Sequence, residues 1–125
     1  MNSYMTIFCD VDGVLLINGS KFTKAKWKTE AIIPNVELLA KYQNENKLYL
    51  VITTSRPESE KKYLEKIFKK YNLKVDQYVM GLPHSRRYLI NDHSNTNLFP
   101  SAISISLDRN SNDLEKLLKP LVKDY

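Results

Sequence analysis

The stretch "TIFCDVDGVLL", residues 6–16, decides the fold. It opens with a continuous apolar run, which is typical of a strand buried on both faces of a parallel sheet. Two aspartates, Asp10 and Asp12, follow at the end of that run, and Gly13 comes next. Because a charge is costly to bury unless it is paired or bound to a metal, we expect this acidic pair to meet a cation.

Strand-like and helical patterns alternate along the rest of the chain. The expected strands cover residues 6–11, 47–54, 75–81, 87–92 and 102–107, and the expected helices cover residues 32–46, 55–71 and 111–122. The helix over 55–71 opens with Ser55 and Glu58 in the S-x-x-E pattern of a capping box. The alternation predicts a three-layer, Rossmann-like α/β fold with a parallel sheet of about five strands and helices on both faces.

Composition places the chain among ordinary globular proteins. It has 125 residues, of which 42% are hydrophobic and 26% charged, so residues 1–125 are expected to form a single domain with one core. Residues 15–28 are interpreted as a small β-hairpin flap and not as a cap domain. No apolar run is long enough to span a membrane, and the N-terminus does not read as a signal peptide. The single cysteine, Cys9, suits a reducing cytoplasm and a buried position.

Lysine accounts for most of the net charge of +5 and lies mainly in residues 21–28 and 60–74. A solvated lysine face explains this pattern, and so does a field that attracts phosphate esters or nucleic acid. Charge alone does not separate the two interpretations.

Polar residues follow the expected strands where ligands bind in open parallel sheets, beyond the carboxyl ends. These residues are Asp10 and Asp12 after the first strand, Thr53, Thr54 and Ser55 after the second, and Arg86, Arg87, Asn91 and Asp92 around the fourth. Three carboxylates near one point require a cation, and a set of oxygen ligands selects a hard ion, Mg²⁺ above others. A hydroxyl and an arginine beside such an ion predict a phosphate site.

These residues resemble the four motifs of the haloacid dehalogenase-like (HAD) superfamily. "DVDGVLL" is similar to the first motif, "VITTSR" to the second, and "RRYLIND" to the basic third motif running into the acidic fourth. The motifs span Ile7 to Asp92 in family order. The chain also resembles small bacterial proteins, some of which accompany surface-polysaccharide genes.

The resemblance implies a role for each acidic residue. Asp10 would be the nucleophile that forms an aspartyl-phosphate, and Asp12 would protonate the leaving oxygen and later activate water. Mg²⁺ would bind the Asp10 carboxylate, the Asp12 backbone carbonyl and Asp92.

The resemblance also implies residues that contact phosphate. Thr54 would donate a hydrogen bond to a phosphoryl oxygen, and Arg87, with Arg86 as the alternative, would neutralise charge. Other residues expected to contact substrate are Gly13, Ser55, Arg56 and Arg86. The chain departs from the family where Arg stands in place of the usual Lys, and where Asp92 has Asn91 instead of a second acid before it.

The sequence therefore predicts a capless, Mg²⁺-dependent phosphatase acting on a sugar phosphate or another small phosphorylated metabolite. A phosphatase of nucleic-acid ends and a non-catalytic HAD-like binding module remain alternatives. A receiver-type signalling domain is disfavoured, because the expected third strand ends in "VMG" without an aspartate. A nucleotide-sugar transferase is disfavoured because such domains are longer. No membrane partner is expected, and a homo-oligomer stays open.

Overall fold

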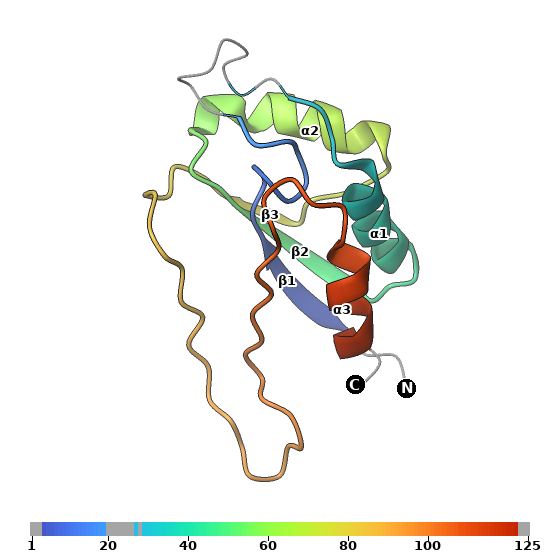
Figure 1. The fold of residues 1–125 in the computed structure, drawn as a ribbon, viewed down its shortest axis with the longest axis vertical. Helices are drawn as coiled ribbons and strands as arrows, with labels where there is room; N and C mark the ends of the chain where they lie inside the picture. Colours follow the sequence, from blue (N-terminus) through green and yellow to red (C-terminus); the bar gives the residue numbers. More distant parts are fainter. Residues whose placement is uncertain (1–3, 20–26, 28, 123–125) are drawn as a thin grey trace.

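A parallel sheet of three strands forms the centre of the computed structural model, which describes residues 4–19, 27 and 29–122. The strands are β1 (Met5–Cys9), β2 (Leu48–Thr53) and β3 (Gln77–Val79), in the spatial order β1-β2-β3. β1 pairs with β2 from Met5 opposite Leu48 to Cys9 opposite Ile52. β1 is therefore an edge strand, and the acidic pair follows its last residue (Figure 1).

Within the described residues, three α-helices accompany the sheet: α1 (Ile33–Asn44), α2 (Lys61–Lys70) and α3 (Leu114–Val122). The expectation of a helix in each of these regions is confirmed, and Pro34 lies in the first turn of α1, where its missing N–H costs nothing. The prediction of a capping box at Ser55 is wrong. A short 3₁₀ helix, η1 (Glu58–Glu60), precedes α2, and no side chain forms a capping hydrogen bond at the start of η1 or of α2.

The helices pack on one face of the sheet. Strand positions Cys9, Leu48, Leu50 and Ile52 belong to the same buried cluster as Val36 and Leu39 of α1, Leu64 and Phe68 of α2, and Leu114 and Leu118 of α3. Side chains alternate between the faces of a strand, so these four strand positions share one face. Right-handed connections between successive neighbouring strands also place α1 and α2 on a common side.

The opposite face of the sheet, called here the helix-free face, carries Thr6, Phe8, Tyr49, Val51, Thr53, Gln77 and Val79. Phe8 is 56% exposed and Val79 is 40% exposed. Gln77 donates a hydrogen bond to the Tyr49 hydroxyl at 2.7 Å across this face. Helices on both faces were expected from the sequence, whereas the described helices cover one.

The prediction of about five strands is wrong, because the sheet has three. Residues 87–92 and 102–107, expected as the fourth and fifth strands, have no regular secondary structure. Their β-branched and aromatic residues favour a strand only where a neighbouring strand pairs with them. The α/β class and the parallel strand direction are confirmed.

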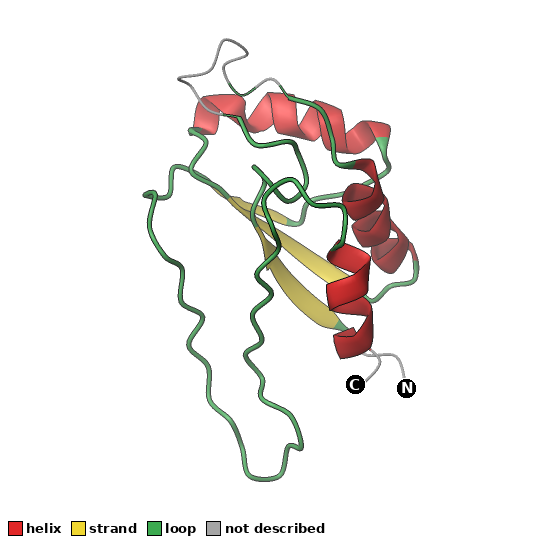
Figure 2. Cartoon of the chain, in the orientation of Figure 1, coloured by secondary structure: helices red, strands yellow, loops and turns green. Residues whose placement is uncertain are grey.

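A long loop takes the place of the two missing strands. Residues 88–104, called here the arm, leave the body of the molecule and return to it (Figures 1 and 2). Every residue from 88 to 101 is exposed. Structureless loops of this length are uncommon in compact domains and are often functional.

The predicted flap over residues 15–28 falls largely outside the described residues, since 20–26 and 28 are not described. The flanking segments are paired: the Ile17 amide donates to the Glu30 carbonyl at 2.8 Å, and Leu16 forms an antiparallel bridge with Ala31. These contacts return the chain to the sheet beside α1.

Candidate functional site

A tight turn directly after β1 presents the acidic pair. The Val11 carbonyl accepts hydrogen bonds from the amides of Leu15 at 2.9 Å and Leu16 at 3.0 Å. The side chains of Val11, Leu15 and Leu16 are fully buried and anchor the turn in the core. Gly13 has a φ of +88°, which favours glycine, and a Cβ at this position would lie 3.2 Å from Cγ of Arg109.

Asp10 is partly open to solvent, with 39% of its side chain exposed. Its Oδ1 accepts a hydrogen bond from the Val11 amide at 2.9 Å, and its Oδ2 lies 3.7 Å from Nη1 of Arg87. Burial raises the pKa of the Asp10 carboxyl, and the nearby Asp12 carboxylate raises it further. The Val11 amide, Arg87 and His84 oppose that rise in pKa.

Asp12 is held by Arg56, whose side chain is fully buried. Nη2 of Arg56 donates to Asp12 Oδ1 at 2.7 Å, and Nε donates to Oδ2 at 3.1 Å. Nη1 of the same guanidinium lies 3.4 Å from the Glu60 carboxylate. Arg56 was expected to contact substrate, and in this structure its guanidinium contacts the carboxylates of Asp12 and Glu60.

The hydroxyl residues after β2 divide between core and surface. Thr54 is fully buried, and its Oγ1 accepts a hydrogen bond from the Arg56 amide at 3.1 Å. Ser55 is half-buried, and its Oγ accepts a hydrogen bond from Nη2 of Arg87 at 3.5 Å. Ser55 therefore lies on the accessible side of the turn, whereas Thr54 shapes the turn from within.

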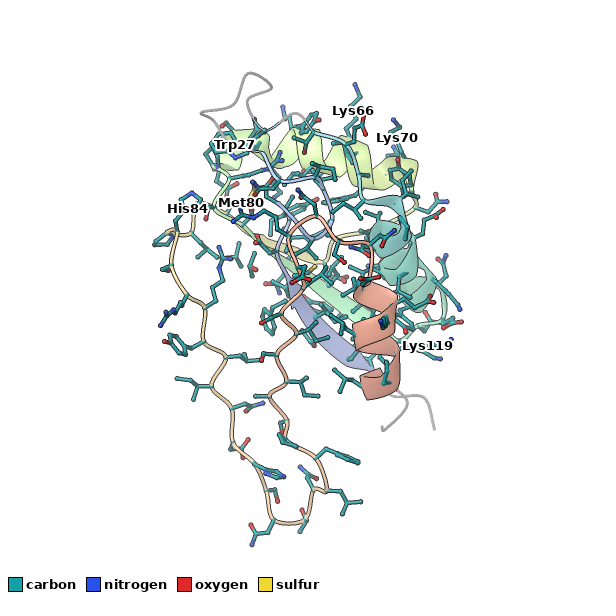
Figure 3. All side chains as sticks on the ribbon, in the orientation of Figure 1. Trp27, Lys66, Lys70, Met80, His84 and Lys119 are labelled. Carbon is teal, nitrogen blue, oxygen red and sulfur yellow. The ribbon has the colours of Figure 1, made fainter. Side chains whose placement is uncertain are left out.

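Arg87 joins the two strand ends, because one guanidinium contacts both Asp10 after β1 and Ser55 after β2. Arg86, the alternative, is exposed, as Arg87 is. The structure brings Asp10, Asp12, Ser55 and Arg87 to the same end of the sheet, whereas Thr54, the expected phosphate donor, is buried beneath them. Figure 3 labels His84 and Met80 at the same end of the sheet, where the chain leaves toward the arm.

Asp92 does not join these residues. It lies on the exposed arm, and the part of the chain that the structure describes holds no group of three His, Cys, Asp or Glu residues able to bind a metal. An extended chain advances by about 3.3 Å per residue, so Asp92 can lie up to ~17 Å beyond Arg87. While Arg87 is held at Asp10, the extended chain carries Asp92 away from the pair.

Sequence reasoning missed two contributors to the site. His84, which lies in the loop after β3, lowers the pKa of Asp10 through its charge. Asn35 of α1 is fully buried, and its Nδ2 donates to the carbonyls of Val14 at 2.7 Å and Ser111 at 2.8 Å. The only sequence signal for this role of Asn35 is its position beside the apolar residues of the predicted helix.

The lysines of α2 lie on its outer surface. Lys66 and Lys70 are exposed and point away from the sheet (Figure 3). This arrangement fits a solvated lysine face. The lysines of residues 21–28 lie outside the described residues.

No protein-family model, curated protein or solved structure matches the chain. Among the described residues, no helix has the length and apolar character needed to cross a membrane.

Proposed function

We propose that the protein is a HAD-type phosphatase that hydrolyses phosphomonoesters through an aspartyl-phosphate. The observation that carries the proposal is the Arg87 guanidinium, which lies between the Asp10 carboxylate and the Ser55 hydroxyl. A carboxylate beside an arginine and a hydroxyl can attack phosphorus while the two donors bind the phosphoryl oxygens. The resemblance to small bacterial proteins favours a sugar phosphate as substrate, and the single cysteine, Cys9, favours the cytoplasm as location.

In the first step, an oxygen of Asp10 attacks phosphorus, and the bond from phosphorus to the leaving oxygen breaks. Asp12 supplies the proton that the leaving oxygen takes up. In the second step, Asp12 removes a proton from water, which attacks the phosphorus and releases phosphate from Asp10. Arg56 is a positioning residue in this scheme, because its two hydrogen bonds fix the orientation of the Asp12 carboxylate.

Phosphate contacts fall to the residues on the accessible side of the site. Arg87 neutralises charge on the phosphoryl group, and Ser55 donates a hydrogen bond to it. Thr54, proposed from its motif as that donor, is buried and supports the turn through its bond to the Arg56 amide. Gly13 allows the chain to turn beside the phosphate.

The acidic pair fits Mg²⁺ as the cofactor. Asp12 raises the pKa of Asp10, which is the repulsion that a bound cation relieves. Mg²⁺ is commonly held by one or two carboxylates and several waters, so the Asp10 carboxylate and the Asp12 carbonyl can hold it. When bound, the ion stabilises negative charge on the phosphoryl oxygens. Asp92 stays a predicted third ligand.

Phosphate release from p-nitrophenyl phosphate and from a panel of sugar phosphates, nucleotides and phosphorylated oligonucleotides tests the proposal. We expect release with Mg²⁺, loss in EDTA, and a loss of roughly 10⁴-fold or more in Asp10→Asn. Glu58→Gln is the matched control, because it makes the same change at an exposed carboxyl of η1. Release that persists in Asp10→Asn would contradict the proposed nucleophile.

A non-catalytic HAD-like binding module is the second candidate. It is favoured by the exposed position of Asp92 on the arm, since the described part of the chain holds no group of three acidic, histidine or cysteine residues placed to bind a metal. Such a module would bind Mg²⁺ and phosphate without releasing phosphate from any ester. Isothermal titration with Mg²⁺ and inorganic phosphate, beside the release assay, separates the two functions. A preference for phosphorylated oligonucleotides would instead identify an enzyme of nucleic-acid ends.

A further inference from the structure

The arm exposes large apolar side chains where a monomer gains nothing from them. Ile90 is 91% exposed, Leu98 is 90% exposed and Tyr88 is 79% exposed. Isolated apolar residues on a surface are normal, but clusters of exposed apolar residues mark an interaction site. The arm carries two such clusters, residues 88–90 and 98–99, on either side of the polar residues 91–97. The segments expected as strands lie within or next to the arm, and the three-stranded sheet pairs with neither of them.

The helix-free face of the sheet is a second surface that lacks a partner element among the described residues. Phe8 is 56% exposed on it, and Val79 is 40% exposed. Sheets in α/β folds are usually covered on both faces, yet the helices of the buried cluster cover only one here. The described part of the molecule therefore exposes apolar side chains at two places, on the arm and at Phe8 and Val79 of the helix-free face, where Val51 between them is only 3% exposed.

Charge identifies what the two surfaces can accept. Asp92 is the only Asp, Glu, Lys or Arg in residues 88–104, although such residues make up 26% of the chain. The helix-free face has none among its seven residues. Nucleic acid and anionic membranes are bound through lysine and arginine, which both surfaces lack. A chain with a net charge of +5 repels its own copies elsewhere, but not through these two surfaces, which carry no lysine or arginine.

We propose that the protein forms a two-fold symmetric dimer in which the arm of one copy covers the helix-free face of a second copy. The exchange is reciprocal, as an isologous interface requires, because each copy supplies one arm and one face. The arm and the face together hold 24 residues in each copy, within the ~20–30 residues a side of a standard interface.

Sedimentation velocity of the full chain across a concentration series tests the dimer. We expect twice the monomer mass at micromolar concentration, which is the range of specific interfaces of this size. Ile90→Asp on the arm and Phe8→Asp on the sheet should each raise the dissociation constant at least about tenfold, because each buries a charge in the interface. Ile90 is almost fully exposed, so its substitution leaves the fold of the monomer intact.

Leu117→Asp is the matched control, since Leu117 of α3 is 40% exposed and lies outside both surfaces. This variant should dimerise as the wild type does. A wild-type chain that stays monomeric overturns the proposal, as does a dimer that Leu117→Asp disrupts and Ile90→Asp does not.

Hydrogen exchange distinguishes a partner copy from the chain's own sheet. If the arm seats on a second copy, the amides of residues 88–92 are protected only at concentrations where the dimer forms. Protection that is independent of concentration means that the arm folds back within one chain, and this result overturns the proposal.

Discussion

Arg56 donates hydrogen bonds to both carboxylate oxygens of Asp12, at 2.7 and 3.1 Å, although the two residues are 44 positions apart in the sequence. The guanidinium is fully buried and also lies 3.4 Å from the Glu60 carboxylate. The pair therefore ties the turn after β1 to the start of α2. The Arg56 guanidinium thus neutralises Asp12, whereas Asp10, the other aspartate after β1, faces the accessible side of the site.

Replacing Arg56 should unfold the protein more readily. Arg56→Ala leaves the Asp12 carboxylate without its partner in a poorly solvated position, and Arg56→Lys loses the two-point geometry. Breaking a buried pair costs about 3–5 kcal/mol, and because Asp12 keeps some contact with water, we expect about 2–3 kcal/mol for Arg56→Ala. Urea denaturation followed by circular dichroism measures the loss.

Arg86→Ala is the control for Arg56, because Arg86 is an exposed arginine. Its unfolding free energy should stay within about 0.5 kcal/mol of the wild type.

Phosphate release should fall in Arg56→Lys even where the protein is fully folded, since Asp12 loses its orientation. Unchanged kcat in folded Arg56→Lys would argue that Arg56 serves stability alone.

The raised pKa of Asp10 predicts a penalty on stability in the metal-free protein. The folded state binds the proton of Asp10 more tightly than the unfolded chain, whose carboxyl keeps the ordinary value of 3.8. The free energy of unfolding therefore falls as pH rises from that value through the raised pKa, and the whole penalty is present above it.

Asp10→Asn should consequently be more stable than the wild type at neutral pH in EDTA, and the two proteins should converge as the pH falls toward the ordinary value of 3.8 and below. The amide that this substitution introduces cannot ionise, while its oxygen can still accept a hydrogen bond from the Val11 amide. Thermal unfolding from acidic to neutral pH measures the difference, with Glu58→Gln as the control. A wild type that is the more stable protein at neutral pH would contradict the direction of the pKa shift.

Cys9 should be inert in the folded protein. Burial raises the pKa of its thiol to about 12, and the neighbouring Asp10 carboxylate contributes to the rise. The thiol also donates to the Asp10 carbonyl, with 3.3 Å between Sγ and the oxygen. Since the thiolate is the reactive form, a thiol reagent at about pH 8 should modify Cys9 only as fast as the protein opens.

A cysteine placed on the arm is the control for Cys9. Ser94→Cys in a Cys9→Ala background puts the thiol on an exposed residue, and it should react at the rate of a free thiol. Rapid modification of Cys9 in the native wild type would show that the end of β1 is open to solvent.

Asn35 should be the most sensitive polar residue of the core. Its side chain donates to the carbonyls of Val14 and Ser111, and its Oδ1 lies 3.4 Å from the Leu114 amide. Asn35→Ala leaves these buried groups unpaired and should cost about 2–3 kcal/mol in urea denaturation. Gln43→Ala, which removes a surface side chain paired with the Lys74 backbone, should cost less than about 1 kcal/mol by the same measure.

The sequence could predict those elements whose pattern is local. An apolar run followed by Asp10 indicated β1, and helical spacing indicated α1, α2 and α3. Residues 87–92 and 102–107 have strand composition but depend on a distant pairing partner, which no local pattern encodes. The same reason applies to the site. The sequence pattern pointed to Arg87, which lies 3.7 Å from Asp10, whereas the pairing of Arg56 with Asp12 joins segments that only the fold brings together.

Gly13 and Gly81 provide a matched pair that separates stability from activity. Gly13 has a φ of +88° and Gly81 a φ of +72°, so alanine is strained at both positions and should cost about 1–2 kcal/mol. A Cβ at Gly13 would lie 3.2 Å from Cγ of Arg109, whereas a Cβ at Gly81 would meet nothing within 4 Å.

Gly13→Ala should also displace the turn that carries Asp10 and Asp12, so phosphate release should fall by at least about tenfold in this variant alone. Release assays at a temperature where both variants are folded measure the difference. If both variants lose release to the same extent, the turn at Gly13 has no special part in positioning the acidic pair.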